Sequence, residues 1–137
     1  MADCIFCLIA VGKIPSLKVH EDAHTLAFMD NNPGTEGHVL VIPKTHADDI
    51  FAIEDHALAA VMHTAKRVSS AAKSVLGVAG VNLFQSNGAV AGQSVFHLHV
   101  HVLPRFAGDK LRLPWIPGEA DKAALGVLAQ RLRAAIA

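Results

Sequence analysis

Three histidines at alternate positions are the most informative feature of this 137-residue chain. They are His97, His99 and His101, and aliphatic residues stand between them. Because a β-strand points successive side chains to opposite faces, a strand here predicts three imidazoles on one face and aliphatic packing on the other. Near neutral pH, imidazoles act as nucleophiles, proton donors or metal ligands. The alternative is a half-exposed strand whose polar histidines have no chemical role.

The spacing of the three histidines favours an anionic substrate over one shared metal ion. Residues two apart on a strand are separated by about 6.6–6.8 Å, so His97 and His101 would lie about 13 Å apart. A single ion does not span that distance. Two neighbouring imidazoles can still converge on one small group, with one attacking it while the other protonates the leaving group.

A glycine-bearing loop over residues 86–93 comes directly before the histidines. Gly88 and Gly92 allow a close approach of the backbone, and successive N–H groups in such a turn can bind an anion. Further donors come from the side chains of Asn87, Gln93 and Ser94. A glycine loop by itself is typical of many hairpin turns, but in front of three histidines it predicts a phosphate pocket.

The only two cysteines, Cys4 and Cys7, form a C-x-x-C pair near the beginning of the chain. A structural disulfide is not expected in a reducing compartment. A redox pair is expected at a helix N-terminus after a strand, and no strand is expected before Cys4. Half of a metal site is therefore favoured over redox chemistry, and two inert thiols remain as an alternative.

The apolar patterning predicts the strands and helices that carry these residues. Strands are expected at residues 26–30, 38–42 and 81–85, and the histidine strand is expected to end at Pro104. A long helix over 55–76 shows an apolar stripe with helical period, and a last helix is expected at about 120–136. Strands and helices that do not alternate strictly predict an α+β fold, an antiparallel sheet covered by helices.

Composition restricts the class of protein further. The length predicts one domain over residues 1–137, and a hydrophobic content of 52% is typical of a globular chain. A formal net charge of zero lacks the basic footprint of a nucleic-acid partner. Neither a signal peptide nor a membrane span is expected, so the predicted location is cytoplasmic, with no membrane partner.

The motif of residues 92–103, which contains the alternating histidines, resembles the signature of the histidine triad (HIT) superfamily. The segments 28–30 and 37–46 resemble the first strands of that family, so the resemblance covers nearly the whole chain from Cys4 to about Arg105. Its N-terminal C-x-x-C is similar to that of many bacterial members. The resemblance implies a HIT-like fold, an AMP-like nucleotide as small-molecule partner and a homodimer.

The resemblance also implies a reaction and roles for the histidines. The reaction is hydrolysis or transfer at the α-phosphate through a nucleotidyl-histidine intermediate. His99 would be the nucleophile, His101 would contact the phosphate and the leaving group, and His38 would set the protonation of the site, while His97 completes the triad. Two substrate classes stay open, nucleoside phosphoramidates or aminoacyl-adenylates on one side and diadenosine polyphosphates on the other. The leaving-group side would involve residues 112–117, with Trp115 as its expected contact.

The nucleotide-binding roles implied by the resemblance fall on two parts of the chain. Asp30 would accept hydrogen bonds from the ribose hydroxyls, although an Asp at a strand end is also common turn chemistry. Phe28 and Asn31 would flank the base and sugar, and a plain core role is the alternative for Phe28. The phosphate oxygens would be held by Asn87, Gln93 and Ser94.

A structural zinc ion is the cofactor that the resemblance implies. Its ligands would be Cys4, Cys7, His46 and His97, a closed set of two thiolates and two imidazoles suited to tetrahedral zinc. Two other classes of function remain beside the enzyme. One is a non-catalytic nucleotide-binding or partner-binding module of the same fold, and the other is a thiol oxidoreductase that uses the two cysteines.

Overall fold

The computed structural model describes residues 3–112 and 116–136, so Trp115 lies outside the described residues. Five antiparallel strands form one sheet in the order β1-β2-β3-β5-β4. The elements in chain order are α1 (Ile5–Ala10), β1 (Lys18–Glu21), β2 (Thr25–Met29), β3 (Val39–Pro43), α2 (Asp55–Leu76), β4 (Gly80–Phe84), η1 (Ala89–Ala91), β5 (Val100–Arg105) and α3 (Lys122–Ile136). The predicted α+β class is confirmed.

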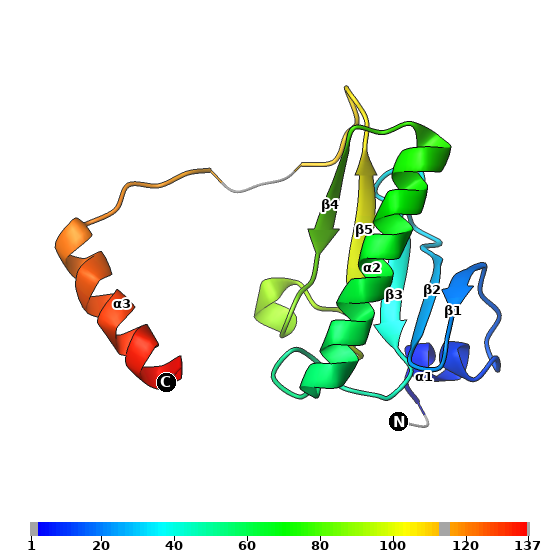
Figure 1. Cartoon of the computed structure of the whole chain (residues 1–137), viewed down its shortest axis with the longest axis horizontal. Coiled ribbons are helices and arrows are strands. Elements are labelled where there is room, and N and C mark those ends of the chain that lie inside the picture. The colour runs from blue at the N-terminus through cyan, green and yellow to red at the C-terminus, as the bar shows by residue number, and fades with distance from the viewer. Residues whose placement is uncertain (1–2, 113–115, 137) are drawn as a thin grey trace.

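The long helix α2 covers one face of the sheet (Figure 1). Its limits are those expected from the apolar stripe, and Gly77 follows it in the left-handed conformation with φ 68°. That conformation lets the Gly77 N–H donate to the carbonyl of Lys73 and close the last turn. The core under α2 joins its buried residues Val61, Ala65 and Val68 to aliphatic side chains of β2, β3 and the histidine segment.

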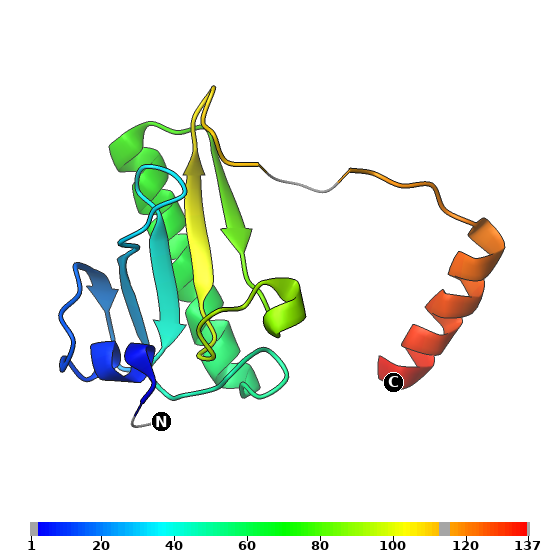
Figure 2. The ribbon, with the colours of Figure 1, turned by 180° about the vertical axis from the view of Figure 1, so that it is seen from behind.

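Two short elements carry no clear sequence signal. Helix α1 has six residues, too few to show a helical period, and β1 is an edge strand that is largely exposed. Figure 2 shows α1 beside the end of the sheet, on the face opposite α2. There it covers a second apolar cluster, which contains Phe6, Ile9, Leu26, Phe28, Leu40 and Ile42.

The histidine strand begins later and ends later than expected. Strand β5 starts at Val100, so His97 and His99 precede the regular pairing, and the strand continues through Pro104. Beyond Val102, β5 pairs with β4 and no longer with β3, which is why a proline without an N–H is tolerated there. The expected alternation of faces is nevertheless confirmed, because Leu98, Val100 and Val102 are buried in the cluster under α2.

The last helix forms where it was expected but has an exposed apolar face. Figures 1 and 2 both show α3 standing away from the sheet, and none of its side chains is buried. Its large apolar residues keep between 46% and 86% of their surface exposed: Leu125, Val127, Leu128, Leu132 and Ile136. One domain over 1–137 therefore stays a prediction. Helices of the described part of the chain lack the length and apolar character to cross a membrane.

Candidate active site and metal-ligand cluster

The candidate site lies on the sheet face opposite α2, where the strand register places four side chains in a row. Phe28 pairs with Leu40, Leu40 with His101, and His101 with Phe84. Paired residues of neighbouring strands point to the same face, so His101 stands between Leu40 and Phe84. The register therefore places an imidazole between two apolar side chains.

A cavity of about 350 Å³ opens on this face. Its lining contains six of the residues expected to bind nucleotide: Phe28, Asp30, Asn31, Ser94, His99 and His101. The other lining residues were not expected from the sequence and are mostly apolar: Ile5, Phe6, Ile9, Met29, Asn32, Leu40 and Val95. Three of these belong to α1 or its first turn, so the short helix that lacked a sequence signal provides one wall of the cavity.

The tautomer of His99 follows from a single hydrogen bond. Its Nδ1 lies 2.8 Å from the carbonyl oxygen of His97. A carbonyl only accepts, so Nδ1 carries the proton and Nε2 keeps its lone pair. The ring is buried and meets the Phe6 ring edge-on, with centroids 5.1 Å apart. Burial also lowers the pKa of His99, which favours the neutral imidazole that a nucleophile requires.

His101 has the tautomer opposite to that of His99. The backbone N–H of Gly34 donates to Nδ1 of His38 over 3.0 Å, so the proton of neutral His38 is on Nε2. That Nε2 donates to Nδ1 of His101 over 2.8 Å. His101 therefore carries its own proton on Nε2. The site thus presents a lone pair on His99 and an N–H donor on His101, with ring centroids 5.0 Å apart.

Burial keeps both members of this pair neutral at pH 7. It lowers the pKa of His38 and lowers that of His101 to about 4. For His101, the positive charges that His99 and His38 would carry lower the pKa further, while Asp30 opposes the shift. An anionic phosphoryl group bound beside the pair would favour its protonated form, because opposite charges stabilise one another.

Asp30 takes part in turn chemistry and also approaches His38, while its ribose-binding role stays a prediction. Its Oδ1 accepts the N–H of Asn32 over 2.7 Å, which is turn chemistry. Its Oδ2 lies 3.5 Å from Nε2 of His38. Since Asp30 also lines the cavity, one carboxylate oxygen holds the turn and the other faces the histidine pair.

The structure places Asn87 and Gln93 outside the cavity lining and uses their polar atoms internally. Gln93 accepts from the N–H of Gly88 over 2.7 Å and donates to the carbonyl of Asp48 over 2.6 Å. Asn87 accepts from the N–H of Ile50 over 2.7 Å. Both amides tie the loop before the histidines to the loop that follows β3. Their phosphate-binding roles stay predictions, and Ser94 is the loop residue that lines the cavity.

The four expected metal ligands come together from three separate parts of the chain. The described residues Cys4, Cys7, His46 and His97 place one ligand atom each within 4.8 Å of one another. The sulfur of Cys4 is 3.4 Å from Nδ1 of His97, and the sulfur of Cys7 is 3.3 Å from Nδ1 of His46. In tetrahedral zinc coordination a sulfur and a nitrogen ligand are about 3.6 Å apart, so the separations fit a zinc ion.

The hydrogen bonds behind these imidazoles fit the same donor set. Nε2 of His97 lies 2.8 Å from the carbonyl of Pro43, and Nε2 of His46 lies 2.7 Å from the carboxylate of Asp48. Both Nε2 atoms therefore carry protons, and both Nδ1 lone pairs face the sulfurs. Burial lowers the pKa of His97 to about 4, which keeps the ring in the neutral form that a ligand needs.

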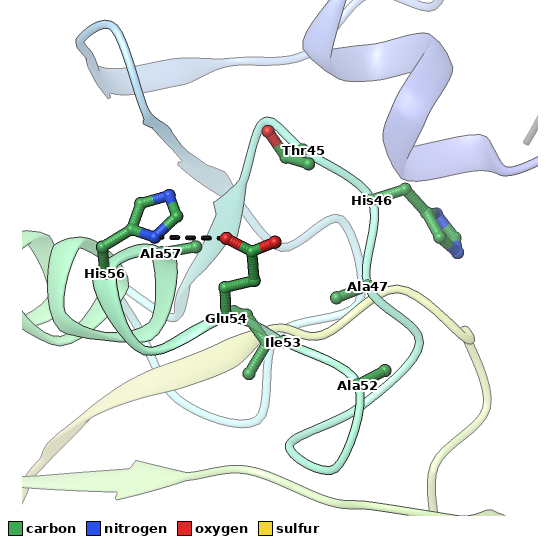
Figure 3. Close-up of a pocket in the computed structure, with 8 residues that line it drawn as sticks. All are labelled: Thr45, His46, Ala47, Ala52, Ile53, Glu54, His56 and Ala57. Atoms are coloured by element: carbon green, nitrogen blue, oxygen red, sulfur yellow. Dashed lines mark ion pairs between the residues drawn. The ribbon is translucent and has the colours of Figure 1, made fainter.

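A smaller hollow of about 150 Å³ lies on the loop before α2 (Figure 3). Glu54 and His56 in its lining approach one another to 3.3 Å, and both are largely exposed. Figure 3 shows the His46 ring turned away from this hollow. This hollow does not contain His99 or His101, which both line the larger cavity.

Comparison with known proteins agrees with this geometry. The HIT domain family matches residues 11–108, and the chain belongs to this family. The crystal structure of SMU.412c from Streptococcus mutans UA159 has a TM-score of 0.95 and 39% identity, and covers 100% of this chain and 87% of that one.

Two further structures are similar over nearly their whole length. A histidine triad nucleotide-binding protein from Candida albicans has a TM-score of 0.87 and 34% identity, over 98% of this chain and 97% of that one. A Zn-bound histidine triad family protein from Mycobacterium smegmatis has a TM-score of 0.78 and 37% identity, over 97% of this chain and 98% of that one.

We expect acidification to destabilise the fold through His101. Its pKa is about 4 in the folded chain against an ordinary 6.5, so between these values the unfolded chain binds more protons at this position. Stability therefore falls as the pH falls from 6.5 towards 4. The groups that face the ring are His38, His99 and Asp30. The melting temperature of the wild type should be lower at pH 5 than at pH 7. This difference should be smaller for His101→Asn.

The matched control is His63→Asn, because His63 is exposed on α2 and away from the site. This variant should lose as much melting temperature as the wild type between the two pH values. An equal loss of melting temperature in the wild type and in His101→Asn would contradict the assignment of the acid destabilisation to His101.

Proposed function

We propose that this chain is an enzyme that cleaves AMP-like substrates at the α-phosphate through a nucleotidyl-histidine intermediate on His99. The observation that carries the proposal is the pairing of tautomers. A carbonyl acceptor leaves His99 with a free Nε2 lone pair, and a backbone donor at the far end of the His38–His101 pair leaves His101 with an Nε2–H. A nucleophile and a hydrogen-bond donor therefore line one cavity.

The apolar end of the cavity is suited to a nucleobase. Phe6 and Phe28 meet edge-on with centroids 5.6 Å apart, and Ile9 and Leu40 complete the apolar wall. Asp30 lines the same cavity and lies 3.5 Å from Nε2 of His38, where its carboxylate would accept hydrogen bonds from ribose hydroxyls. The order along the cavity is thus base, sugar and phosphate, and the phosphate lies next to His99 and His101.

The proposed reaction consists of two successive displacements at phosphorus. The His38–His101 pair takes up one proton as the anionic substrate binds. The Nε2 lone pair of His99 forms an N–P bond, the bond to the leaving group breaks, and the departing atom takes that electron pair and a proton from His101. Water then attacks phosphorus, the N–P pair returns to His99, and the proton released by water passes to the histidine pair and on to solvent.

The central prediction concerns His99. His99→Ala removes the attacking atom and should lower AMP release at least about a thousandfold. The measurement is AMP release from adenosine 5′-phosphoramidate and from a diadenosine polyphosphate, in parallel. His63→Ala is the matched control and should keep the wild-type rate, because that side chain is exposed and outside the cavity.

Two results would contradict this proposal. A folded His99→Ala protein that keeps the wild-type rate would exclude His99 as the nucleophile. A wild-type protein that binds AMP and releases none from either substrate would instead favour a binding module of the same fold.

We further propose that Cys4, Cys7, His46 and His97 hold a structural zinc ion. The Zn-bound relative and the two Nδ1 lone pairs that face the sulfurs support this. Zinc would supply a closed, tetrahedral link and no open position for chemistry. Because α1 carries Phe6 between the two cysteines, such a link holds the apolar wall of the cavity against the histidine segment.

Cys4→Ser should therefore lower the melting temperature and the bound zinc together, and affect the rate of the chemical step less. Metal content and melting curves of the wild type and the variant, each with and without a chelator, measure this. The chelator should lower the melting temperature of the wild type more than that of the variant. An unchanged melting temperature and metal content in Cys4→Ser would count against the zinc site.

We also propose that the protein is a homodimer in which a second copy covers the apolar face of α3. The Streptococcus mutans structure matches the whole chain, α3 included, which supports the same separation of this helix from the sheet. An uncovered 15-residue helix is marginal in water, so a stable α3 needs a partner surface.

Light scattering should give twice the chain mass of 14.5 kDa for the wild type. The double variant Leu128→Asp, Leu132→Asp places charges on the apolar face and should give a single chain mass. Gln130→Asp on the same helix is the control and should stay dimeric. A wild-type mass of one chain, or a dimer that survives the double variant, would overturn this arrangement.

A further inference from the structure

The two cysteines are the accessible part of the metal-ligand cluster. Both are half-buried, whereas the ligand His97 is fully buried. The sulfurs of Cys4 and Cys7 lie 3.4 and 3.5 Å from the same nitrogen, Nδ1 of His97, and within 4.8 Å of one another. The pair is therefore open to a small oxidant from solvent, and its two sulfurs are already close together.

The start of α1 allows these two sulfurs to bond to one another. Cys4 caps the helix and Cys7 stands one turn later, where its N–H donates to the Cys4 sulfur over 3.4 Å. Residues three apart on a helix are neighbours, and the chain has no other cysteine. A sulfur in a disulfide is no longer a thiolate, which is the form that binds zinc. Oxidation of the pair therefore removes two of the four ligands at once.

Helix α1 is the first of three links from the cysteines to the nucleotide cavity. Phe6 lies between the cysteines in sequence, and its ring centroid is 5.6 Å from that of Phe28 and 5.1 Å from that of His99. Ile5, Phe6 and Ile9 line the cavity. A helix of six residues is too short to be stable by itself, so its place depends on packing and on the ligands in its first turn. Loss of the metal link therefore leaves the apolar wall of the cavity less firmly held.

The other two links run through the imidazole ligands. The carbonyl of His97 accepts the Nδ1 proton of His99, so a shift of His97 moves the proposed nucleophile. Nε2 of His46 lies 2.7 Å from the carboxylate of Asp48, whose backbone carbonyl accepts from Gln93 over 2.6 Å. Gln93 in turn closes the glycine-bearing loop before the histidines. The metal-ligand cluster is thus connected to the apolar wall, to the nucleophile and to the loop beside it.

We infer that Cys4 and Cys7 are a site of reversible oxidation, at which a peroxide forms a disulfide, releases the zinc ion and weakens nucleotide binding. The inference rests on the proposed zinc site and nucleotide cavity and adds redox sensitivity to them. One thiolate attacks the O–O bond and becomes a sulfenic acid, and the second thiolate attacks that sulfur. Two thiolates, one hydrogen peroxide and two protons give one disulfide and two waters. The sulfurs lose the two electrons that the peroxide gains.

The test follows the zinc-bound wild type before and after treatment with hydrogen peroxide. Peroxide should remove both free thiols, release the zinc ion and lower the melting temperature. The Kd for AMP should rise at least about fivefold, the lower end of typical coupling between two sites. Coupling is reciprocal, so saturating AMP should raise the zinc affinity of the reduced protein by the factor by which zinc raises its AMP affinity. A chelator titration with and without AMP measures this factor.

Two controls assign the effect to the cysteines. Dithiothreitol followed by zinc should restore the thiols, the melting temperature and the Kd for AMP. The same treatment does not reduce a sulfoxide at Met29, which also lines the cavity and is the other target of peroxide there. Cys4→Ser cannot form the disulfide, so its Kd for AMP should exceed that of the untreated wild type and should be the same before and after peroxide.

An AMP affinity that survives oxidation of both thiols would overturn the inference, and so would thiols and zinc that excess peroxide leaves in place. A loss of affinity that dithiothreitol and zinc do not reverse would also overturn it. The untreated protein reports the proposed function separately. If it holds zinc and binds AMP while peroxide has no effect, only the redox sensitivity is overturned. A reduced protein without zinc overturns the zinc site as well, and one that binds no AMP overturns the nucleotide cavity.

Discussion

The hydrogen bonds of His97 are the interactions on which the rest of the site depends. This fully buried residue donates from Nε2 to the carbonyl of Pro43 and directs its Nδ1 lone pair to the sulfur of Cys4. Its own carbonyl accepts the Nδ1 proton of His99. One residue therefore holds the end of β3, the N-terminal cysteines and the tautomer of the proposed nucleophile. A change in its position would disturb the metal-ligand cluster and the reactive nitrogen together.

Backbone groups, rather than acidic side chains, decide where the protons of this site lie. A carbonyl oxygen faces Nδ1 of His99, while the N–H of Gly34 faces Nδ1 of His38. The carbonyl leaves His99 with a lone pair on Nε2. The N–H of Gly34 acts through His38 and leaves His101 with a proton on Nε2, so the two rings have opposite tautomers. Backbone groups do not titrate near neutral pH, so this assignment holds as long as the turn around Gly34 and the chain at His97 keep their positions.

The two faces of the sheet differ: one packs against α2 and the other bears the cavity. One face packs Leu98, Val100 and Val102 under α2, which anchors the segment that bears the histidines. The other face is covered only in part by α1, so a cavity remains beside His99 and His101. The cysteines at the two ends of the first turn of α1 join this cover to the histidine segment. The proposed zinc ion would thus stabilise the wall of the cavity without taking part in the reaction.

The features that depend on local periodicity could be predicted from the sequence. These include the limits of α2, the strands β2, β3 and β4 to within a residue, and the separation of aliphatic and histidine faces. The family motif also pointed to the cluster around Cys4 and to six of the thirteen residues that line the cavity. The internal hydrogen bonds of Asn87 and Gln93, the cavity wall formed by α1 and the exposure of α3 became visible only in the folded chain. Periodicity reflects neighbours along the chain, whereas cavities and tautomers depend on contacts between residues far apart in sequence.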